Sequence, residues 1–184
     1  MRIKISSEPV ENLNHEGLIL GFFSDERPPR GYCGLADWRL NGIISKQIKK
    51  GKFTGAFREK VLITPDYRIP SSKILLFGLG KSTNLTYDQI YTAGHIISQT
   101  VTRINCNDSA FDIPGPDRCN LQMSEMTTAM ISGFADSLVE NQKQSDIISI
   151  CILGDDTYRD EITLGANQFK VNVKNKIKVT IVEA

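Results

Sequence analysis

Two nearly continuous apolar runs constrain the fold of this chain more than any other feature. Lys73–Leu79 and Ile147–Leu153 carry apolar side chains at almost every position. Such runs are typical of strands buried on both faces, which occur where helices cover both sides of a largely parallel sheet. We therefore expect both runs to be central strands of an α/β fold.

Shorter segments with alternating polarity, or bounded by Gly and Pro, predict further strands. They are Arg2–Ser6, Gly17–Phe23, Phe57–Thr64, Ser109–Ile113 and Ile177–Val182. Helices are expected between the strands at about Ala36–Lys50, Thr86–Ile104, Leu121–Glu140 and Thr157–Phe169. The sequence thus predicts three layers: a mixed, partly parallel sheet of about six or seven strands with helices on both faces.

The helix starts and apolar stripes support this assignment. Thr86-x-x-Gln89 is a capping box, and Thr157 is the expected cap of the last helix. The helix at Leu121–Glu140 has a methionine-rich stripe, which predicts a core-facing side. Lysines gather at the end of the helix that stops at Gly51 (Lys46, Lys49 and Lys50). Basic residues stabilise a helix carboxyl terminus, so this cluster requires no ligand.

Length and charge exclude several classes of partner. A length of 184 residues predicts one domain over 1–184. Lys+Arg number 22 against 21 Asp+Glu, which gives no electrostatic reason to expect nucleic acid or an anionic membrane. The amino terminus lacks the apolar core of a signal peptide, and no apolar stretch reaches the roughly 18 residues of a membrane span. We expect a cytoplasmic protein that does not contact membranes.

Cysteines and histidines offer little for catalysis. The four cysteines (Cys33, Cys106, Cys119 and Cys151) include no C-x-x-C pair, and we expect all of them to be reduced. His95 falls opposite the apolar stripe of its helix, which indicates a surface side chain. His15 precedes Glu16, but no second histidine follows at the spacing of a zinc-binding H-E-x-x-H motif. No catalytic residue, metal or cofactor is predicted.

The most conspicuous motif is Gly78-Leu79-Gly80-Lys81-Ser82-Thr83, placed between a buried strand and a helix. It resembles the second half of a nucleotide-binding phosphate loop. Such a loop also needs a glycine five positions before the Gly of Gly-Lys-Ser, and that position holds Leu75. Nucleoside triphosphate hydrolysis is therefore not expected.

The turn nevertheless follows a central strand, where open α/β sheets place their ligand crevices. Its amides could hold a small anion, or its glycines could simply permit a tight turn. A second polar turn, Gly154-Asp155-Asp156, follows the other apolar run. The candidate ligand-binding residues are therefore Gly78, Gly80, Lys81, Ser82, Gly154 and Asp155. The acidic residues after Gly154 begin a helix, and their charge complements its dipole without a metal.

Three segments carry a family resemblance. They are Ile74–Lys81, Asp37-x-x-Leu40-Asn41-Gly42-Ile43-Ile44, and Gly51-x-Phe53-x-Gly55. Together they resemble the amino-terminal domain of the leucyl aminopeptidase metallopeptidases, and the resemblance extends from about Gly17 to Val182. It implies a macro-domain-like fold that, in those enzymes, precedes a separate catalytic domain.

The chain also departs from that family. The Gly-Lys-x-Gly-Glu-like stretch of the family is represented only by Thr54–Glu59, and its aromatic-Arg-Phe segment is replaced by Ser137–Val139. The catalytic metal signature, Asn-Thr-Asp-Ala-Glu-Gly-Arg, is absent, and the chain ends where the catalytic domain would begin. We therefore expect a free-standing domain without the peptidase chemistry.

Three functions remain open from the sequence. The first is a non-catalytic interaction or regulatory module, with a separate peptidase subunit as a possible protein partner. The second is a macro-like pocket for a nucleotide or ADP-ribose derivative, in which Asp25 is the one candidate for reading the adenine amine. The third is a DNA-binding accessory domain, which the resemblance suggests and the balanced charge disfavours because DNA affinity rests on clustered cations.

Overall fold

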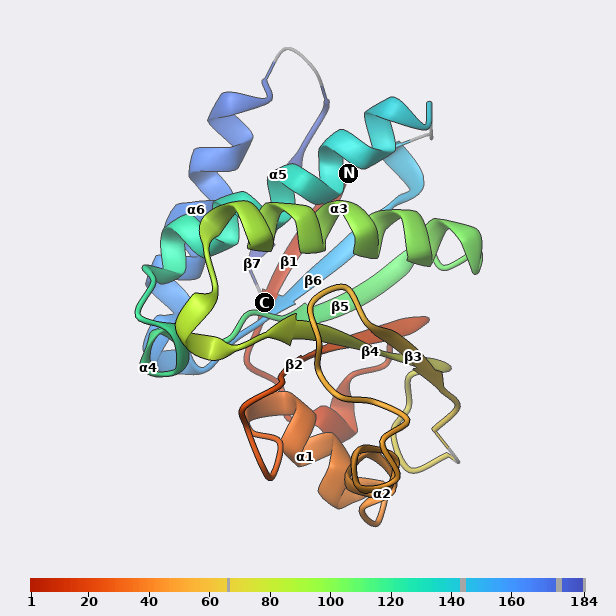
Figure 1. Cartoon of the computed structure of the whole chain (residues 1–184). Helices are drawn as coiled ribbons and strands as arrows, with labels where there is room; N and C mark the ends of the chain where they lie inside the picture. Colours follow the sequence, from red (N-terminus) through yellow and green to blue (C-terminus); the bar gives the residue numbers. More distant parts are fainter. Residues whose placement is uncertain (66, 143–144, 175–176, 184) are drawn as a thin grey trace.

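One sheet organises the molecule. The computed structural model describes residues 1–65, 67–142, 145–174 and 177–183, and within them seven strands pair in the order β3-β4-β2-β5-β6-β1-β7 (Figure 1). The strands are β1 Arg2–Ser6, β2 Gly17–Phe23, β3 Lys60–Ile63, β4 Lys73–Gly80, β5 Asp108–Asp112, β6 Ser149–Leu153 and β7 Thr180–Glu183. Only the β3–β4 pairing is antiparallel among these strands. The carboxyl ends of the other strands therefore meet at one edge.

The predicted α/β class and three-layer arrangement are confirmed. Both apolar runs form interior strands, β4 and β6, with a paired neighbour on each side. β1 and β2 have the predicted bounds, β4 extends one residue further, to Gly80, and the other strands are shifted or shortened. β3 begins at Lys60 and not at Phe57, because the preceding residues turn across β4: the Arg58 amide donates to Gly78 O (3.1 Å).

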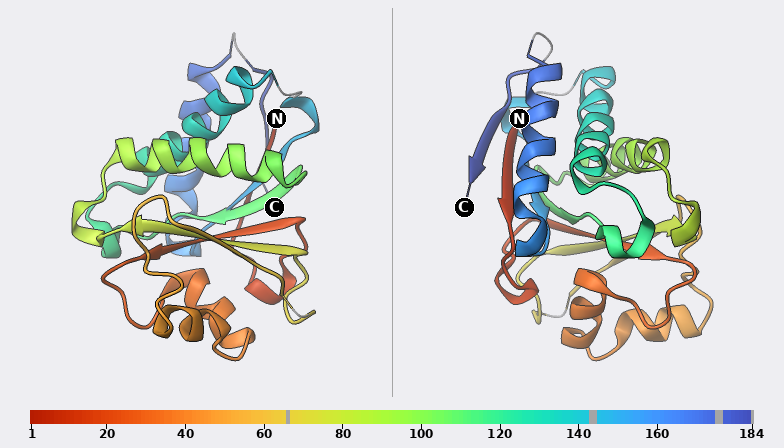
Figure 2. Two further views of the ribbon diagram at one scale, coloured as in Figure 1. Left: turned by 45° about the vertical axis from the view of Figure 1, so that its right-hand side comes forward. Right: turned by 90° about the vertical axis from the view of Figure 1, so that its left-hand side faces the viewer.

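Helices cover both faces of the sheet (Figures 1 and 2). α1 (Gly31–Arg39) and α2 (Ile43–Lys49) lie on one face. α3 (Tyr87–Arg103), α5 (Met123–Glu140) and α6 (Arg159–Asn172) lie on the other, and α4 (Pro116–Cys119) is a single turn beyond β5. The connection after β2 thus leads to one face, and those after β5 and β6 lead to the other. Such a reversal of direction opens a crevice at the carboxyl edge of a parallel sheet.

The expected single helix over Ala36–Lys50 is wrong. Asn41 and Gly42 have φ values of 54° and 72°, a left-handed conformation that ends α1 before α2 begins. Buried Asp37 holds the two helices together, since its carboxylate accepts from the Ser45 amide at 3.0 Å and from the Ser45 hydroxyl. Apolar residues occur on both sides of this break, so the sequence pattern did not reveal it.

The other helix signals are largely confirmed. The Thr86–Gln89 capping box forms, and the apolar stripes of α3 and α5 are buried. Thr157 does not cap α6: it lies in a single 3-10 turn, where its amide donates to the Asp155 carboxylate (2.9 Å). α6 starts two residues later, at Arg159.

The cysteine thiols are buried in the fold, and both histidine rings lie beside carboxylates. The four cysteines are free and buried. His15 Nδ1 lies 2.9 Å from Asp108 Oδ2, and His95 Nε2 lies 2.7 Å from Glu140 Oε2. His95 is therefore a half-buried side chain at the surface, paired with an exposed carboxylate. In the described part of the chain, no helix is both long and apolar enough to span a bilayer.

Candidate functional site

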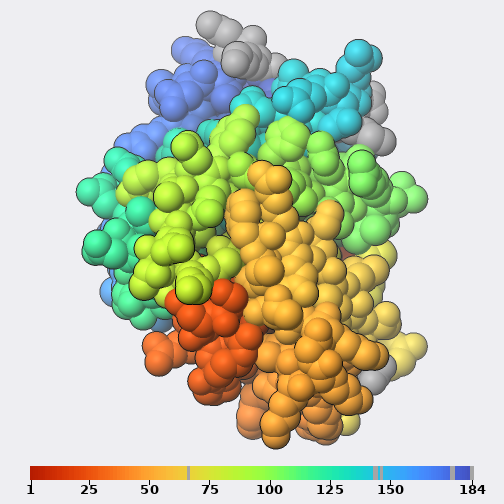
Figure 3. All heavy atoms as spheres, viewed as in Figure 1, coloured from red at the N-terminus to blue at the C-terminus, as the bar shows by residue number. Residues whose placement is uncertain are grey.

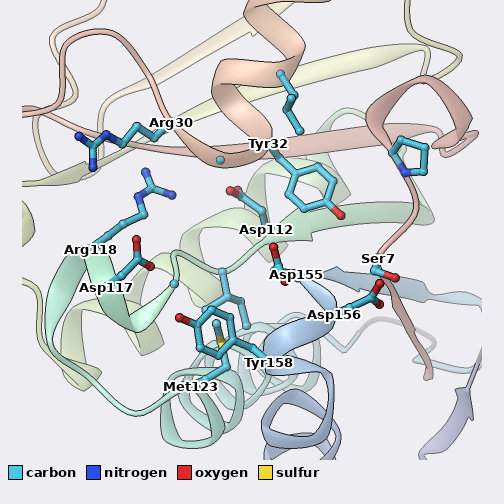
Figure 4. A pocket seen from close by; sticks show the side chains of 16 residues that line it. Ser7, Arg30, Tyr32, Asp112, Asp117, Arg118, Met123, Asp155, Asp156 and Tyr158 are labelled. Atoms are coloured by element: carbon cyan, nitrogen blue, oxygen red, sulfur yellow. The ribbon is translucent and has the colours of Figure 1, made fainter.

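A pocket of about 580 Å³ opens at the carboxyl edge of the sheet. It lies where the chain leaves β1, β5 and β6 and where α1 begins, which is the crevice predicted by the reversal of connections. Figure 4 shows its polar side chains: Arg30, Asp117 and Arg118 on one side, Ser7 and Asp156 on the opposite side, and Asp112, Tyr32 and Asp155 between them. Its volume is in the usual range for small-molecule sites.

Asp112, the last residue of β5, forms the centre of this pocket. The side chain is buried, with 7% of its surface exposed. Oδ1 accepts from the Gly21 amide of β2 (2.9 Å), whereas Oδ2 has no hydrogen-bond partner among the described residues. Burial raises the pKa of Asp112, opposed by Arg118 and by the Gly21 N–H. A half-satisfied buried carboxylate is costly to the fold, so it is a candidate for a functional group.

The basic side of the pocket is built around a buried ion pair. Arg118 donates from Nε and Nη2 to Glu26, at 2.9 and 2.6 Å, and its guanidinium lies over the Phe23 ring. This fixes the third nitrogen, Nη1, beside Gly31, where a Cβ atom would lie 3.0 Å from it and 3.7 Å from Asp112 Oδ2. Gly31 also has a positive φ of 57°. Glycine is therefore required here by both conformation and space.

The first turn of α1 faces the same side. Arg30 is the N-cap residue, and no side chain caps the helix. The first amides of a helix have no partner within it and attract negative charge. Arg30 and the amides of Gly31 and Tyr32 therefore form a polar, electropositive wall beside Arg118 Nη1. Burial, with Asp112 nearby, raises the pKa of Tyr32 to about 12, and its hydroxyl donates to Glu8 O (3.2 Å).

The acidic side follows β6. Asp155 and Asp156 are exposed, and the Thr157 amide and side chain lower the pKa of Asp155 by hydrogen bonding to its carboxylate. Gly154 is buried beneath them, and its amide donates to Ser6 O of β1 (3.2 Å). Gly154 and Asp155 thus line the pocket, as predicted for ligand-binding residues, although their ligand role itself stays a prediction.

The Gly78–Ser82 turn lies outside this pocket; the amides of Gly78, Gly80 and Ser82 have partners within the chain, and Lys81 is exposed. The Gly78 amide donates to Glu59 O (2.8 Å), and the Gly80 amide to Gly55 O (2.9 Å). The Ser82 amide and hydroxyl donate to the Asp25 carboxylate at 3.0 and 2.9 Å. Asp25 was the candidate for reading the adenine amine. Its own carboxylate instead binds the turn whose amides were suggested to hold a small anion.

A clasp formed by residues 54–59 covers this turn. Glu59 Oε2 accepts from the amides of Thr54, Gly55 and Ala56, at 2.8, 2.8 and 3.2 Å. A Cβ at Gly78 would overlap the Ala56 carbonyl oxygen. In Figure 3 the chain around residues 50–60 (orange), the segment after β2 (red-orange) and the start of α3 (yellow-green) meet at the surface. The motif is therefore explained by close packing, and anion binding there stays a prediction.

Sequence reasoning missed the residues that matter most to the pocket. Asp112 is the last residue of the buried strand β5, and Arg118 lies in the short helix α4, which the sequence did not predict. A polar residue at the last position of a buried parallel strand was the available signal. The pairing of Arg118 with Glu26, 92 positions away, had no signal in the sequence.

Comparison with known proteins places the chain in a family. The N-terminal domain of the cytosol aminopeptidase family matches residues 19–144. The chain belongs to this family. Probable cytosol aminopeptidases of Geobacter sp. (strain M21) and Alkaliphilus oremlandii are 34% and 30% identical over 97 and 90 residues. These matches cover 52% and 49% of this chain but only 19% and 18% of the relatives, so the chain spans about a fifth of their length.

Solved structures show the same fold at low identity. A tomato leucine aminopeptidase mutant has a TM-score of 0.66 at 17% identity, covering 90% of this chain and 35% of that one. An Oceanobacillus iheyensis macrodomain with ADP has a TM-score of 0.71 at 10% identity, covering 92% and 90%. A Trypanosoma brucei macrodomain in complex with ADP-ribose has 0.68 at 12%, covering 87% and 67%. The macro-domain-like architecture implied by the sequence is confirmed.

The donor set of the described residues does not suit a metal ion. Within those residues, no group of three or more His, Cys, Asp or Glu side chains is arranged to hold one. Asp155 and Asp156 are adjacent in the chain, but a divalent cation needs more ligands than two exposed carboxylates supply. No metal step enters the function proposed below.

Proposed function

We propose that this domain is a non-catalytic regulatory module that binds a small molecule in the pocket at the carboxyl edge. One observation carries the proposal: buried Asp112 brings to a pocket of about 580 Å³ a carboxylate oxygen that has no hydrogen-bond partner among the described residues. Such an oxygen gains a hydrogen bond when a ligand with a donor group enters. A peptidase subunit is the proposed recipient of the signal, since the family's longer members are aminopeptidases.

The side chains around the pocket suit binding better than catalysis. Its lining contains no histidine, cysteine or lysine among the described residues, so Ser7 lacks the imidazole or amine that usually activates a serine nucleophile. Both histidines pair with carboxylates elsewhere. Burial raises the pKa of the thiols of Cys33 and Cys151, which makes them poor nucleophiles at neutral pH.

The non-catalytic half of the proposal is tested by peptidase assay. The purified chain is incubated with leucyl p-nitroanilide and added Mn²⁺ or Zn²⁺, beside an unrelated protein purified identically from the same host. We expect no p-nitroaniline release above that control. Metal-dependent release that co-purifies with the chain and exceeds the control would overturn the non-catalytic assignment.

The binding half is tested by thermal shift with a defined panel: the common amino acids, a set of dipeptides, adenosine, ADP and ADP-ribose. We expect at least one compound to raise the Tm of the wild type, as a ligand selective for the native state must. Asp156→Asn should reduce the shift, whereas Asp160→Asn, a neighbouring exposed carboxylate outside the pocket, should not. Equal shifts in both variants, or none with any compound, would contradict the proposal.

A nucleotide or ADP-ribose derivative is the second candidate. The uncapped start of α1 beside Arg30 suits a phosphate group, and macrodomains of the same fold have been solved with ADP and ADP-ribose. Calorimetry with ADP-ribose tests this candidate. Saturable heat that Arg30→Gln abolishes would support it, and no heat at millimolar ligand would exclude it.

A further inference from the structure

The charges in the pocket are unequally distributed between its two sides. Arg30, Arg118 and the start of α1 lie on one side, together with the single carboxylate of Asp117, and Asp156 lies on the opposite side (Figure 4). Asp155 and Asp112 lie between them. A ligand that extends across this pocket therefore meets positive charge at one end and negative charge at the other.

The basic end suits a carboxylate. The Arg30 guanidinium has no hydrogen-bond or ion-pair partner within the described chain, and Arg118 keeps Nη1 free because Glu26 uses only Nε and Nη2. The α1 amides add donors without a side-chain cap. Together these groups offer the combination of guanidinium and helix-terminus donors that binds carboxylates and phosphates.

The centre requires a hydrogen-bond donor. Asp112 lies in the pocket (Figure 4), where its Oδ1 is held by the Gly21 amide and its Oδ2 lies beside Gly31, another residue of the lining. An N–H group in the middle of a ligand would give this oxygen its missing partner. An ester or ether oxygen at the same position would face it with a second acceptor and leave it unsatisfied.

The acidic end suits an ammonium group. Asp156 has no hydrogen-bond partner among the described residues, and Asp155 uses Oδ1 for the Thr157 amide. Apolar surface completes the lining, from Leu35, Ile113 and Met123. The lining carries four carboxylates (Asp112, Asp117, Asp155 and Asp156) against two guanidinium groups, a balance that opposes a doubly charged pyrophosphate.

We propose that the pocket binds a short peptide with free termini, such as a dipeptide: its ammonium at Asp155 and Asp156, its amide N–H at Asp112 Oδ2, and its carboxylate at Arg30, Arg118 Nη1 and the start of α1. This inference rests on the proposed function of the same pocket and names its ligand. An apolar side chain of the peptide packs on Leu35, Ile113 and Met123. The peptide is bound as a signal and is not cleaved.

The test uses L-alanyl-L-leucine and three analogues, each lacking one predicted contact. N-acetylation removes the ammonium charge, C-terminal amidation removes the carboxylate, and the ester analogue removes the central N–H. Binding is followed by the amide NMR signals of Gly31, Gly115 and Gly154, which line the pocket. We expect saturable shifts with the free dipeptide, and each analogue to bind roughly ten- to hundred-fold more weakly, because each loses a hydrogen bond to a charged group.

Variants of the protein test the same contacts. Arg30→Gln should weaken the free dipeptide but not its amidated analogue, and Asp156→Asn should weaken the free dipeptide but not its acetylated analogue. Arg103→Gln and Asp160→Asn, both exposed and outside the pocket, are the matched controls. Because Arg30 and Asp156 are exposed at the surface, their substitution should leave the fold intact.

The possible results separate this inference from the function on which it rests. Equal binding of the dipeptide and its three analogues would overturn it, as would shifts produced by ADP-ribose and not by the dipeptide; either result leaves the pocket as a ligand site. If neither the dipeptide nor ADP-ribose at ten millimolar moves the three glycine signals, and no compound of the panel shifts the Tm, both the inference and the proposed function are wrong.

Discussion

Two glycine-containing turns at the carboxyl edge of the sheet have opposite environments. Gly78–Ser82 spans the end of β4, and Gly154–Asp156 follows β6. At the first, Asp25 and the 54–59 clasp satisfy the turn from within the chain. At the second, the carboxylates face a pocket. A turn becomes available to a ligand only when no other segment of the chain completes it.

The difference between the two turns is greatest in the space around their glycines. In Gly78→Ala the new Cβ would overlap the Ala56 carbonyl, which belongs to the backbone and cannot move cheaply. In Gly154→Ala it would meet Ile162 Cδ1, the end of a flexible side chain. We expect losses in the free energy of unfolding of about 3 kcal/mol or more for the first and about 1 kcal/mol for the second. Urea unfolding measures both, and equal losses would contradict the comparison.

The clasp gives the next largest effect. Glu59→Ala removes the acceptor for three amides and for the Thr54 hydroxyl. The group is partly exposed, so water replaces some of these bonds, and we expect a loss of about 1–2 kcal/mol. Lys52→Ala, in the same loop, is the control and should change the unfolding free energy by less than about 0.5 kcal/mol. If Glu59→Ala matches this control, the clasp does not stabilise the turn.

The pH dependence of stability tests the contact between Asp25 and the Gly78–Ser82 turn. Burial raises the pKa of Asp25, but hydrogen bonds from the Ser82 amide and hydroxyl outweigh this and lower it overall. A lowered pKa contributes stability that is present above the unfolded value and lost as the pH falls through the folded one. Asp25→Asn should therefore cost about 0.5–1 kcal/mol at pH 7, a small amount because the group is exposed. The gap from wild type should begin to close as the pH falls below about 4 and should vanish once the pH is below the folded pKa. A gap that persists in acid would contradict the assignment.

The sequence predicted the sheet better than it predicted the pocket, for a physical reason. Burial of a strand is written in its own residues, so Gly17–Phe23 was located to the residue. The break at Asn41–Gly42 depends on two left-handed backbone conformations, which the apolar pattern on either side does not record. The pocket depends on contacts between distant segments, such as Asp112 with Gly21 and Arg118 with Glu26. Ligand-binding residues in the turn after β6 could be predicted because the carboxyl ends of parallel strands converge at one edge of the sheet. The clasp of residues 54–59 over Gly78 could not be predicted.

Asp112→Asn should give the smallest change in the free energy of unfolding, and the sign of that change is the most informative. Burial raises the pKa of Asp112, so ionisation costs stability as the pH rises from the unfolded pKa through the folded one, and the cost is absent in acid. Asp112→Asn keeps an oxygen for the Gly21 amide and removes the charge. We expect an unfolding free energy at pH 7 that is unchanged or higher by up to about 1 kcal/mol, with no difference at low pH.

The same substitution turns a donor toward the pocket in place of Oδ2 and should weaken dipeptide binding. At pH 7 the urea midpoint should then be lower than that of the wild type for Asp25→Asn, and equal or higher for Asp112→Asn. In acid both differences from the wild type should disappear. If both variants lose stability at pH 7 to the same extent, Asp112 is a structural carboxylate like Asp25, and the two turns no longer differ in kind.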